Sequence, residues 1–269
     1  MKKQSHRSPW KLPSGVSSGL WDYTQSDVVA NDYDDYFSYT RLFSMDEQII
    51  LDELKANGNP GDLIADLGCG TGRALETLCP KGYRGLAVDL SWPMLKVVSE
   101  KIRKLKLDVN CLRANLVELD VIAQHSVDHC ICLFSTLGMI QGRENRRQAL
   151  QHMARIIRPG GSCVLHLHNY WFNLYDPGGP WWLVRNLFAS GCSRTLEMGD
   201  KSFDYRGVPN MFLHVFRWRE IRKDLRLAGF RIQRVVPLHA RRHREIQWPW
   251  CLPNLRANGW IIVARSANI

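Results

Sequence analysis

Between residues 62 and 168, short apolar runs alternate with segments whose apolar residues recur at helical spacing. An apolar run without a polar residue at every second position is typical of a strand that is buried on both faces. Buried strands that alternate with helices predict a parallel sheet covered by helices on both faces. The strands predicted here are residues 62–66, 85–89, 109–113, 127–134 and 162–168. The helices predicted between them are residues 73–79, 93–105 and 144–157.

The alternation is interrupted after residue 168. Residues 169–216 are rich in Trp, Pro and Gly, which predicts an irregular insertion with one strand near its end, at 211–216. A helix and two strands follow at 218–227, 231–236 and 260–264. This order predicts an α/β fold with a seven-stranded, mostly parallel sheet, an antiparallel seventh strand and the insertion after strand five.

Two segments precede the alternation. Residues 1–20 are rich in Ser, Gly, Pro and Lys, a composition that predicts a flexible tail. Residues 21–60 carry apolar residues at helical spacing and predict a helical cap. The rest of the chain is then divided into a core at 61–168, the insertion at 169–216 as a substrate lid, and a C-terminal part of the same sheet at 217–269.

Length and composition fit one α/β domain with an insertion. The 269 residues are 45% hydrophobic and 23% charged, and no stretch approaches the roughly 20 apolar residues of a membrane helix. The basic N-terminus is not followed by the apolar run of a secretion signal. We therefore expect a cytoplasmic protein with no membrane span, in which the eight cysteines are reduced thiols.

The charge is large and unevenly distributed. The formal net charge is +10, residues 22–53 are acidic, and residues 217–244 are dense in arginine. The basic segment indicates attraction to anions such as nucleic acid or acidic metabolites. Solvated helix surfaces account for both segments equally well, so both interpretations stay open.

The most informative segment follows the first predicted strand, where an acid precedes three glycines at alternate positions. Glycines let the backbone turn sharply and approach a ligand, and the helix that starts here offers unpaired N–H groups. The GxGxG spacing differs from the GxGxxG of dinucleotide-binding dehydrogenases. Asp89 ends the second strand, where a carboxylate can accept both hydroxyls of a ribose. The segment is Asp66-Leu67-Gly68-Cys69-Gly70-Thr71-Gly72.

Together these motifs resemble those of the class I S-adenosylmethionine (SAM)-dependent methyltransferases. The run that starts at Asp89 is similar to the family's D-x-S-x-x-M-L, residues 133–137 to its fourth-strand motif, and residues 155–161 to its turn into strand five. Asn115 stands where the family usually has Asp, and its amide oxygen can still accept a bond from adenine.

The resemblance implies a Rossmann-like fold with SAM as the cofactor, bound by the core at 61–168. It covers about residues 40–168 and resumes over 218–265. The cofactor-binding residues that it implies are Asp66, Gly68, Cys69, Gly70, Gly72, Asp89, Leu90, Met94, Asn115, Leu116 and Phe134.

Transfer to a hydroxyl or amine often needs a base with a pKa near neutrality, most commonly His. His168 is the candidate, because ligands of open α/β sheets bind at the carboxyl ends of the strands. His166 shares its face of the strand, and a packing or hydrogen-bonding role stays open for both. A zinc site made with Cys130 and Cys132 would not have the spacing of a known ligand pair, so we expect no metal.

Three functions are open at this point. The first is a methyltransferase that acts on a small molecule. The second is an RNA methyltransferase, acting on tRNA, whose basic 217–244 segment and nearby Trp248 and Trp250 would bind phosphates and stack bases. The third is a SAM-binding regulatory protein without catalysis, because an intact glycine loop indicates binding and not turnover.

Overall fold

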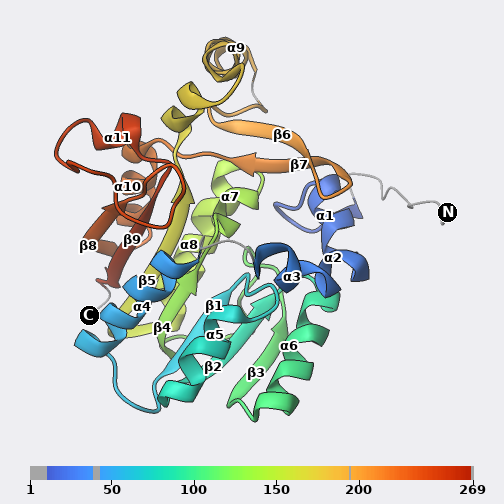
Figure 1. The fold of residues 1–269 in the computed structure, drawn as a ribbon, viewed down its shortest axis with the longest axis vertical. Helices are drawn as coiled ribbons and strands as arrows, with labels where there is room; N and C mark the ends of the chain where they lie inside the picture. The colour runs from blue at the N-terminus through green and yellow to red at the C-terminus, as the bar shows by residue number, and fades with distance from the viewer. Residues whose placement is uncertain (1–10, 39–42, 194, 268–269) are drawn as a thin grey trace.

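Seven strands form one sheet in the order β3-β2-β1-β4-β5-β9-β8 in the computed structural model, which describes residues 11–38, 43–193 and 195–267. Strands β1 to β5 run parallel, and β9 is antiparallel to both of its neighbours, β5 and β8. This confirms the mostly parallel, Rossmann-like sheet with an antiparallel last strand (Figure 1). The strands are β1 (Leu63–Leu67), β2 (Arg84–Asp89), β3 (Val109–Arg113), β4 (Val127–Cys132), β5 (Ile157–His168), β8 (Phe230–Pro237) and β9 (Gly259–Ser266).

Helices cover both faces of this sheet. On one face, α4 (Ser44–Asn57), α5 (Arg73–Leu78) and α6 (Trp92–Leu105) pack against the strands. On the other face, α7 (Thr136–Met139), α8 (Arg143–Ile156) and α10 (Trp218–Leu227) do so. The short elements outside these layers are α1 (Ser18–Thr24), α2 (Asp27–Asn31), α3 (Tyr33–Ser38), η2 (Cys79–Lys81) and α11 (Pro253–Arg256).

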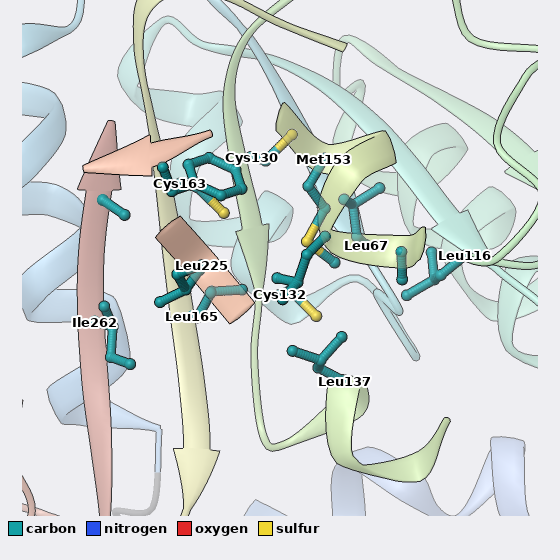
Figure 2. Packing of buried hydrophobic residues seen from close by; sticks show 14 of the residues in the cluster. Leu67, Leu116, Cys130, Cys132, Leu137, Met153, Cys163, Leu165, Leu225 and Ile262 are labelled. Carbon is teal, nitrogen blue, oxygen red and sulfur yellow. The ribbon is translucent and has the colours of Figure 1, made fainter. Parts of the chain in front are cut away.

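Strand alternation separates the two cores. Cys130, Cys163 and Leu165 point to the face covered by α8 and α10, where Figure 2 shows them beside Met153 and Leu225. Residues at the intervening positions of the same strands lie in the core under α4, α5 and α6. Both faces of each central strand are therefore buried, which explains why the sequence has apolar runs there instead of an alternating pattern.

The cysteines are free thiols throughout the described residues, as expected. The conceivable zinc site is not assembled. Cys130 and Cys132 lie in the core under α8, whereas His166 is on the opposite face of β5, where it pairs with Asp46. The reason is the two-residue period of a strand, which places odd and even positions on different faces.

The insertion is more regular than its composition suggests. It contains the 3-10 helix η3 (Tyr170–Tyr175), the helix α9 (Gly179–Cys192) and a hairpin of β6 (Asp200–Tyr205) with β7 (Val208–His214). Pro180 lies in the first turn of α9, where its missing N–H leaves no hydrogen bond unmade. The expectation of an irregular insertion is therefore wrong, and the strand expected at 211–216 is the second half of this hairpin.

The expected tail at 1–20 also differs from the structure in its second half. Ser14 Oγ donates to Glu118 at 2.7 Å, the Gln141 N–H donates to the Gly15 carbonyl at 2.8 Å, and Val16 is buried. These two hydrogen bonds and the buried Val16 side chain hold the segment against the domain. Residues 1–10, the first half of the expected tail, lie outside the described residues.

The described part of the expected cap at 21–60 contains the helices α1 to α4, and its residues 39–42 lie outside the described ranges. In Figure 1, the β6–β7 hairpin extends from the side of β5 toward α1, and α1 contacts β7. No helix in the described ranges combines the length and apolar character needed to cross a membrane.

Candidate functional site

The glycine loop forms a tight backbone turn between β1 and α5. Gly68, Gly70 and Gly72 all have positive φ values, of 80°, 53° and 75°. A Cβ at Gly68 would lie 2.3 Å from the Thr136 side chain, whereas a Cβ at Gly70 would have no neighbour closer than 3.9 Å. Gly68 therefore allows close packing within the fold, and Gly70 keeps the backbone open toward the adjoining cavity.

Asp89 is fixed by this loop and by the start of α6. Its Oδ2 accepts the Gly70 N–H at 2.8 Å, and its Oδ1 accepts the Ser91 N–H at 2.8 Å. Burial raises the pKa of Asp89 to about 6, although hydrogen bonds from Ser91 and Gly70 lower it. Burial, and then the charge of Asp89, raises the pKa of Asp66 to about 8. Neither side chain has a cationic partner within 4.0 Å among the described residues. Asp89, with the lower pKa of the two, is the one suited to a ligand that donates hydrogen bonds.

One cavity at the carboxyl ends of β1 and β2 brings together the residues expected to bind the cofactor, apart from Gly72. Gly72 instead precedes α5, and a Cβ there would press on Val98. Its role is therefore in the packing of the loop. The expected residues that line the cavity are Asp66, Gly68, Cys69, Gly70, Asp89, Leu90, Met94, Asn115, Leu116 and Phe134.

Asn115 holds the N-terminal segment over this cavity. Its Nδ2 donates to the Ser14 carbonyl at 2.9 Å, and its Oδ1 accepts the Val117 N–H at 3.2 Å. An Asp at this position could not donate to a carbonyl, which gives the departure from the family pattern a structural reason. Gly15 and Val16 then line the cavity, a role that the expectation of a flexible tail missed.

Three charged residues of the cavity, Asp46, Glu47 and Arg73, were also missed from the sequence. The Arg73 guanidinium lies 3.2 Å from the centroid of the Phe43 ring. Asp46 is buried, and its Oδ1 lies 2.7 Å from Nδ1 of the buried His166. A signal for Asp46 exists in the sequence, because it lies three and four residues before the buried Ile49 and Ile50 on one face of α4.

A second cavity of about 660 Å³ adjoins the first. Both cavities are lined by Tyr23, Tyr33, Phe134 and Met139. The second cavity is walled further by side chains from the insertion, on η3 and on the β6–β7 hairpin. Its polar lining includes His168, Lys201 and Arg242.

His168 lies in the second cavity, but its surroundings do not suit a base. Arg242 Nη1 lies 3.0 Å from His168 Nε2, and because a guanidinium only donates, Nε2 must be the acceptor and the ring neutral. Burial, followed by the charges of Arg242, His166 and Lys201, lowers the pKa of His168 well below its usual value. The geometry favours the hydrogen-bonding alternative over the general base.

A buried ionic cluster lies outside both cavities. Glu197, His214 and Glu220 are close enough together to be considered as metal ligands. Both ring nitrogens of His214 are already paired, however, with Asp200 at 2.8 Å and with Glu220 at 3.0 Å. Arg146 pairs with Glu197 at 2.8 Å. The protein's own side chains therefore supply positive charge to these carboxylates. The cluster joins α8, the hairpin and α10.

Comparisons with known proteins point to one kind of domain. A family model described as a methyltransferase domain matches residues 64–161. The cypemycin N-terminal methyltransferase of Streptomyces sp is 31% identical over 105 residues, which are 39% of this chain and 41% of that protein. The probable tRNA methyltransferase 9B of Mus musculus is 29% identical over 155 residues, which are 54% of this chain and 30% of that protein.

A solved structure extends the likeness along the chain. The 1,6-didemethyltoxoflavin-N1-methyltransferase of Burkholderia thailandensis, solved with 1,6-didemethyltoxoflavin and S-adenosylhomocysteine bound, has a TM-score of 0.60 at 17% identity. The superposition covers 96% of this chain and 93% of that one, so the two share their fold. The chain spans about half the length, or less, of the curated relatives that it matches.

Proposed function

We propose, from the premise that the chain belongs through residues 64–161 to the class I SAM-dependent methyltransferase family, that it transfers the methyl group of SAM to a small molecule. The observation that carries this proposal is the pair of adjoining cavities. One has the glycine loop and Asp89, and the other is walled by aromatic side chains, with Phe134 lining both. Such an arrangement suits a cofactor and an acceptor that meet at a shared boundary.

The residues of the first cavity fit SAM. Bound SAM supplies an electrophilic methyl group on a sulfonium. Asp89 would accept the ribose hydroxyls, since its two oxygens are already oriented by the Gly70 and Ser91 N–H groups. Leu90, Met94 and Leu116 would border the adenine, and Gly70 leaves its backbone open to the methionine end. Each of these assignments joins a lining residue to the part of SAM that its chemistry suits.

The second cavity would position the acceptor. Transfer requires the nucleophile to lie about 3 Å from the methyl carbon and opposite the sulfur. The shared lining by Tyr23, Tyr33, Phe134 and Met139 would hold the acceptor at that boundary. The hairpin and η3 cover this cavity from the side of the insertion, which supports the expected role of the insertion as a substrate lid. A cavity of about 660 Å³ has the size of a small-molecule site.

The cofactor assignment is tested by calorimetric titration with S-adenosylhomocysteine. Asp89→Ala should weaken binding about 100-fold, because it removes charge-assisted hydrogen bonds worth about 3 kcal/mol. Asp108→Ala, at an exposed carboxylate that pairs with Arg84, is the matched control and should bind as the wild type does. Asp89→Asn keeps the side-chain shape in case the alanine variant does not fold.

Absence of binding to the wild-type protein would overturn the proposal. If the protein binds S-adenosylhomocysteine but forms none from SAM with any of a broad set of small molecules, the regulatory alternative would be supported instead.

One observation favours RNA as the acceptor. Trp248 and Trp250 are 63% and 80% exposed in the loop that precedes α11, and the Trp248 carbonyl accepts from Arg256 at 3.2 Å. Exposed aromatic rings near arginines can stack on unpaired bases. Nucleic acid that co-purifies with the protein, with an affinity that falls steeply with salt and is lost in a Trp248→Ala/Trp250→Ala variant, would support this alternative.

A further inference from the structure

We infer that the acceptor is an anion with an aromatic or otherwise flat apolar body, and that Arg242 binds its negative charge. This inference rests on the proposed methyl transfer, and it specifies what the second cavity takes. It is carried by the placement of one arginine, by the charges around it and by the nature of the cavity walls.

Arg242 is partly buried in the wall of the second cavity, and the carboxylate whose charge acts on it, that of the buried Asp46, is not paired with it. Its Nη1 donates to neutral His168 at 3.0 Å, and its guanidinium lies 5.0 Å from the centroid of the Phe134 ring. Within the ranges that the structure describes, no carboxylate oxygen comes within 4.0 Å of it. A guanidinium has five N–H donors in a fork that fits a carboxylate or a phosphate, and most of them have no strong acceptor here.

The rest of the cavity adds positive charge. Lys201 also lines it, with its Nζ 2.9 Å from the Asn173 amide oxygen and 3.8 Å from Asp176. Asp176 is the sole carboxylate among the described lining residues, and its side chain is 50% exposed. Two cations therefore line the cavity with one well-solvated anion, and the buried Asp46, which does not line it, adds a negative charge that acts on Arg242.

Burial makes this arrangement costly in the absence of a ligand. It lowers the pKa of Arg242, although the charge of the buried Asp46 raises it. Charged groups removed from water are normally paired. A ligand anion would supply the missing partner and would gain a charge-assisted hydrogen bond that a neutral ligand cannot make.

The walls favour a flat apolar body. Phe37, Phe134, Phe172, Phe203 and Tyr205 contribute rings to the lining. Aromatic rings pack on other flat rings by offset stacking or edge contacts. Since Phe134 also lines the cofactor cavity, Arg242 would hold the charge of the acceptor close to the sulfonium, and opposite charges there attract one another.

The test compares two probes of the same shape, naphthalene-2-carboxylate and the neutral naphthalene-2-carboxamide. Their dissociation constants are measured by calorimetry at pH 7.5, with and without saturating S-adenosylhomocysteine. The proteins are the wild type, Arg242→Gln, and Arg244→Gln as the matched control, because Arg244 is an exposed arginine of the same loop.

We expect the wild type and Arg244→Gln to bind the acid at least about tenfold more tightly than the amide. Arg242→Gln should bind the two probes equally and should keep the wild-type affinity for S-adenosylhomocysteine. Equal binding of acid and amide by the wild type, no binding of either probe, or an unchanged acid preference in Arg242→Gln would overturn the inference. Failure of the methyltransferase proposal is separable, since it appears as loss of S-adenosylhomocysteine binding by the wild type.

Discussion

Replacing Asn115 with Asp tests whether one side-chain hydrogen bond holds the N-terminal segment over the cofactor cavity. Asn115 Nδ2 donates to the Ser14 carbonyl at 2.9 Å, and Gly15 and Val16 beside it line the cavity. Asp would keep the shape of the side chain and its bond from the Val117 N–H. It would, however, place a carboxylate oxygen against the Ser14 carbonyl, where no proton is available to either oxygen.

The size of the effect follows from that geometry. Loss of a partly exposed amide–carbonyl hydrogen bond costs about 1 kcal/mol, and repulsion between the two oxygens brings the cost to about 2 kcal/mol. If the segment contributes to binding, the affinity for S-adenosylhomocysteine should fall between about fivefold and about 30-fold. A carboxylate at position 115 would also accept a hydrogen bond from the adenine amino group more strongly than the amide does. This gain in affinity would oppose the loss caused by the broken tether.

Calorimetry gives the affinity, and hydrogen exchange followed by mass spectrometry gives the protection of residues 11–20. We expect weaker binding together with faster exchange in that segment. Asn110→Asp is the matched control, because it makes the same change of charge at an exposed position of β3. Equal or tighter binding by Asn115→Asp, with exchange in 11–20 unchanged, would refute the role given to the tether.

Two further results follow from charged groups described above. Affinity for S-adenosylhomocysteine should decrease as the pH falls through about 6, because protonation of Asp89 removes an acceptor for the ribose hydroxyls, and Asp89→Asn should lose this dependence. His214→Gln should lower the free energy of unfolding by about 3 kcal/mol in urea titrations, because it leaves two buried carboxylates without their shared cation. Burial alone would lower the pKa of His214, but its bonds to Asp200 and Glu220 raise it. The contribution of His214 is therefore fully present below its unfolded pKa of about 6.5 and is lost as the pH rises through the higher folded value; a stability difference that grows with pH would contradict this reasoning.

The sheet could be predicted from the sequence because each central strand is buried on both faces. Short apolar runs such as residues 127–134 are typical of such strands, and the glycine loop after β1 marks where ligands bind. The parallel direction of the first five strands needed only their regular alternation with helices. These features are local, so a single sequence is enough to show them.

What escaped prediction depends on contacts between distant segments. Ser14 and Asn115 are 101 residues apart, and Arg242 and His168 are 74 residues apart. Nothing in the basic 217–244 stretch distinguishes Arg242 from its exposed neighbours, because the fold alone turns it toward a cavity. Helix α9 was missed for a different reason. The Trp and Pro content of its segment was interpreted as irregular structure, although a helix tolerates Pro180 in its first turn.

The shared lining of the two cavities has a consequence for inhibitor chemistry. Tyr33 and Phe134 border both spaces and therefore lie at the boundary between them. A bivalent ligand that joins an adenosine to a flat acid through a short linker would lose translational freedom once and engage both spaces. Its affinity would exceed that of either half by a factor set by the linker, which makes the junction at Phe134 the natural place for linker attachment.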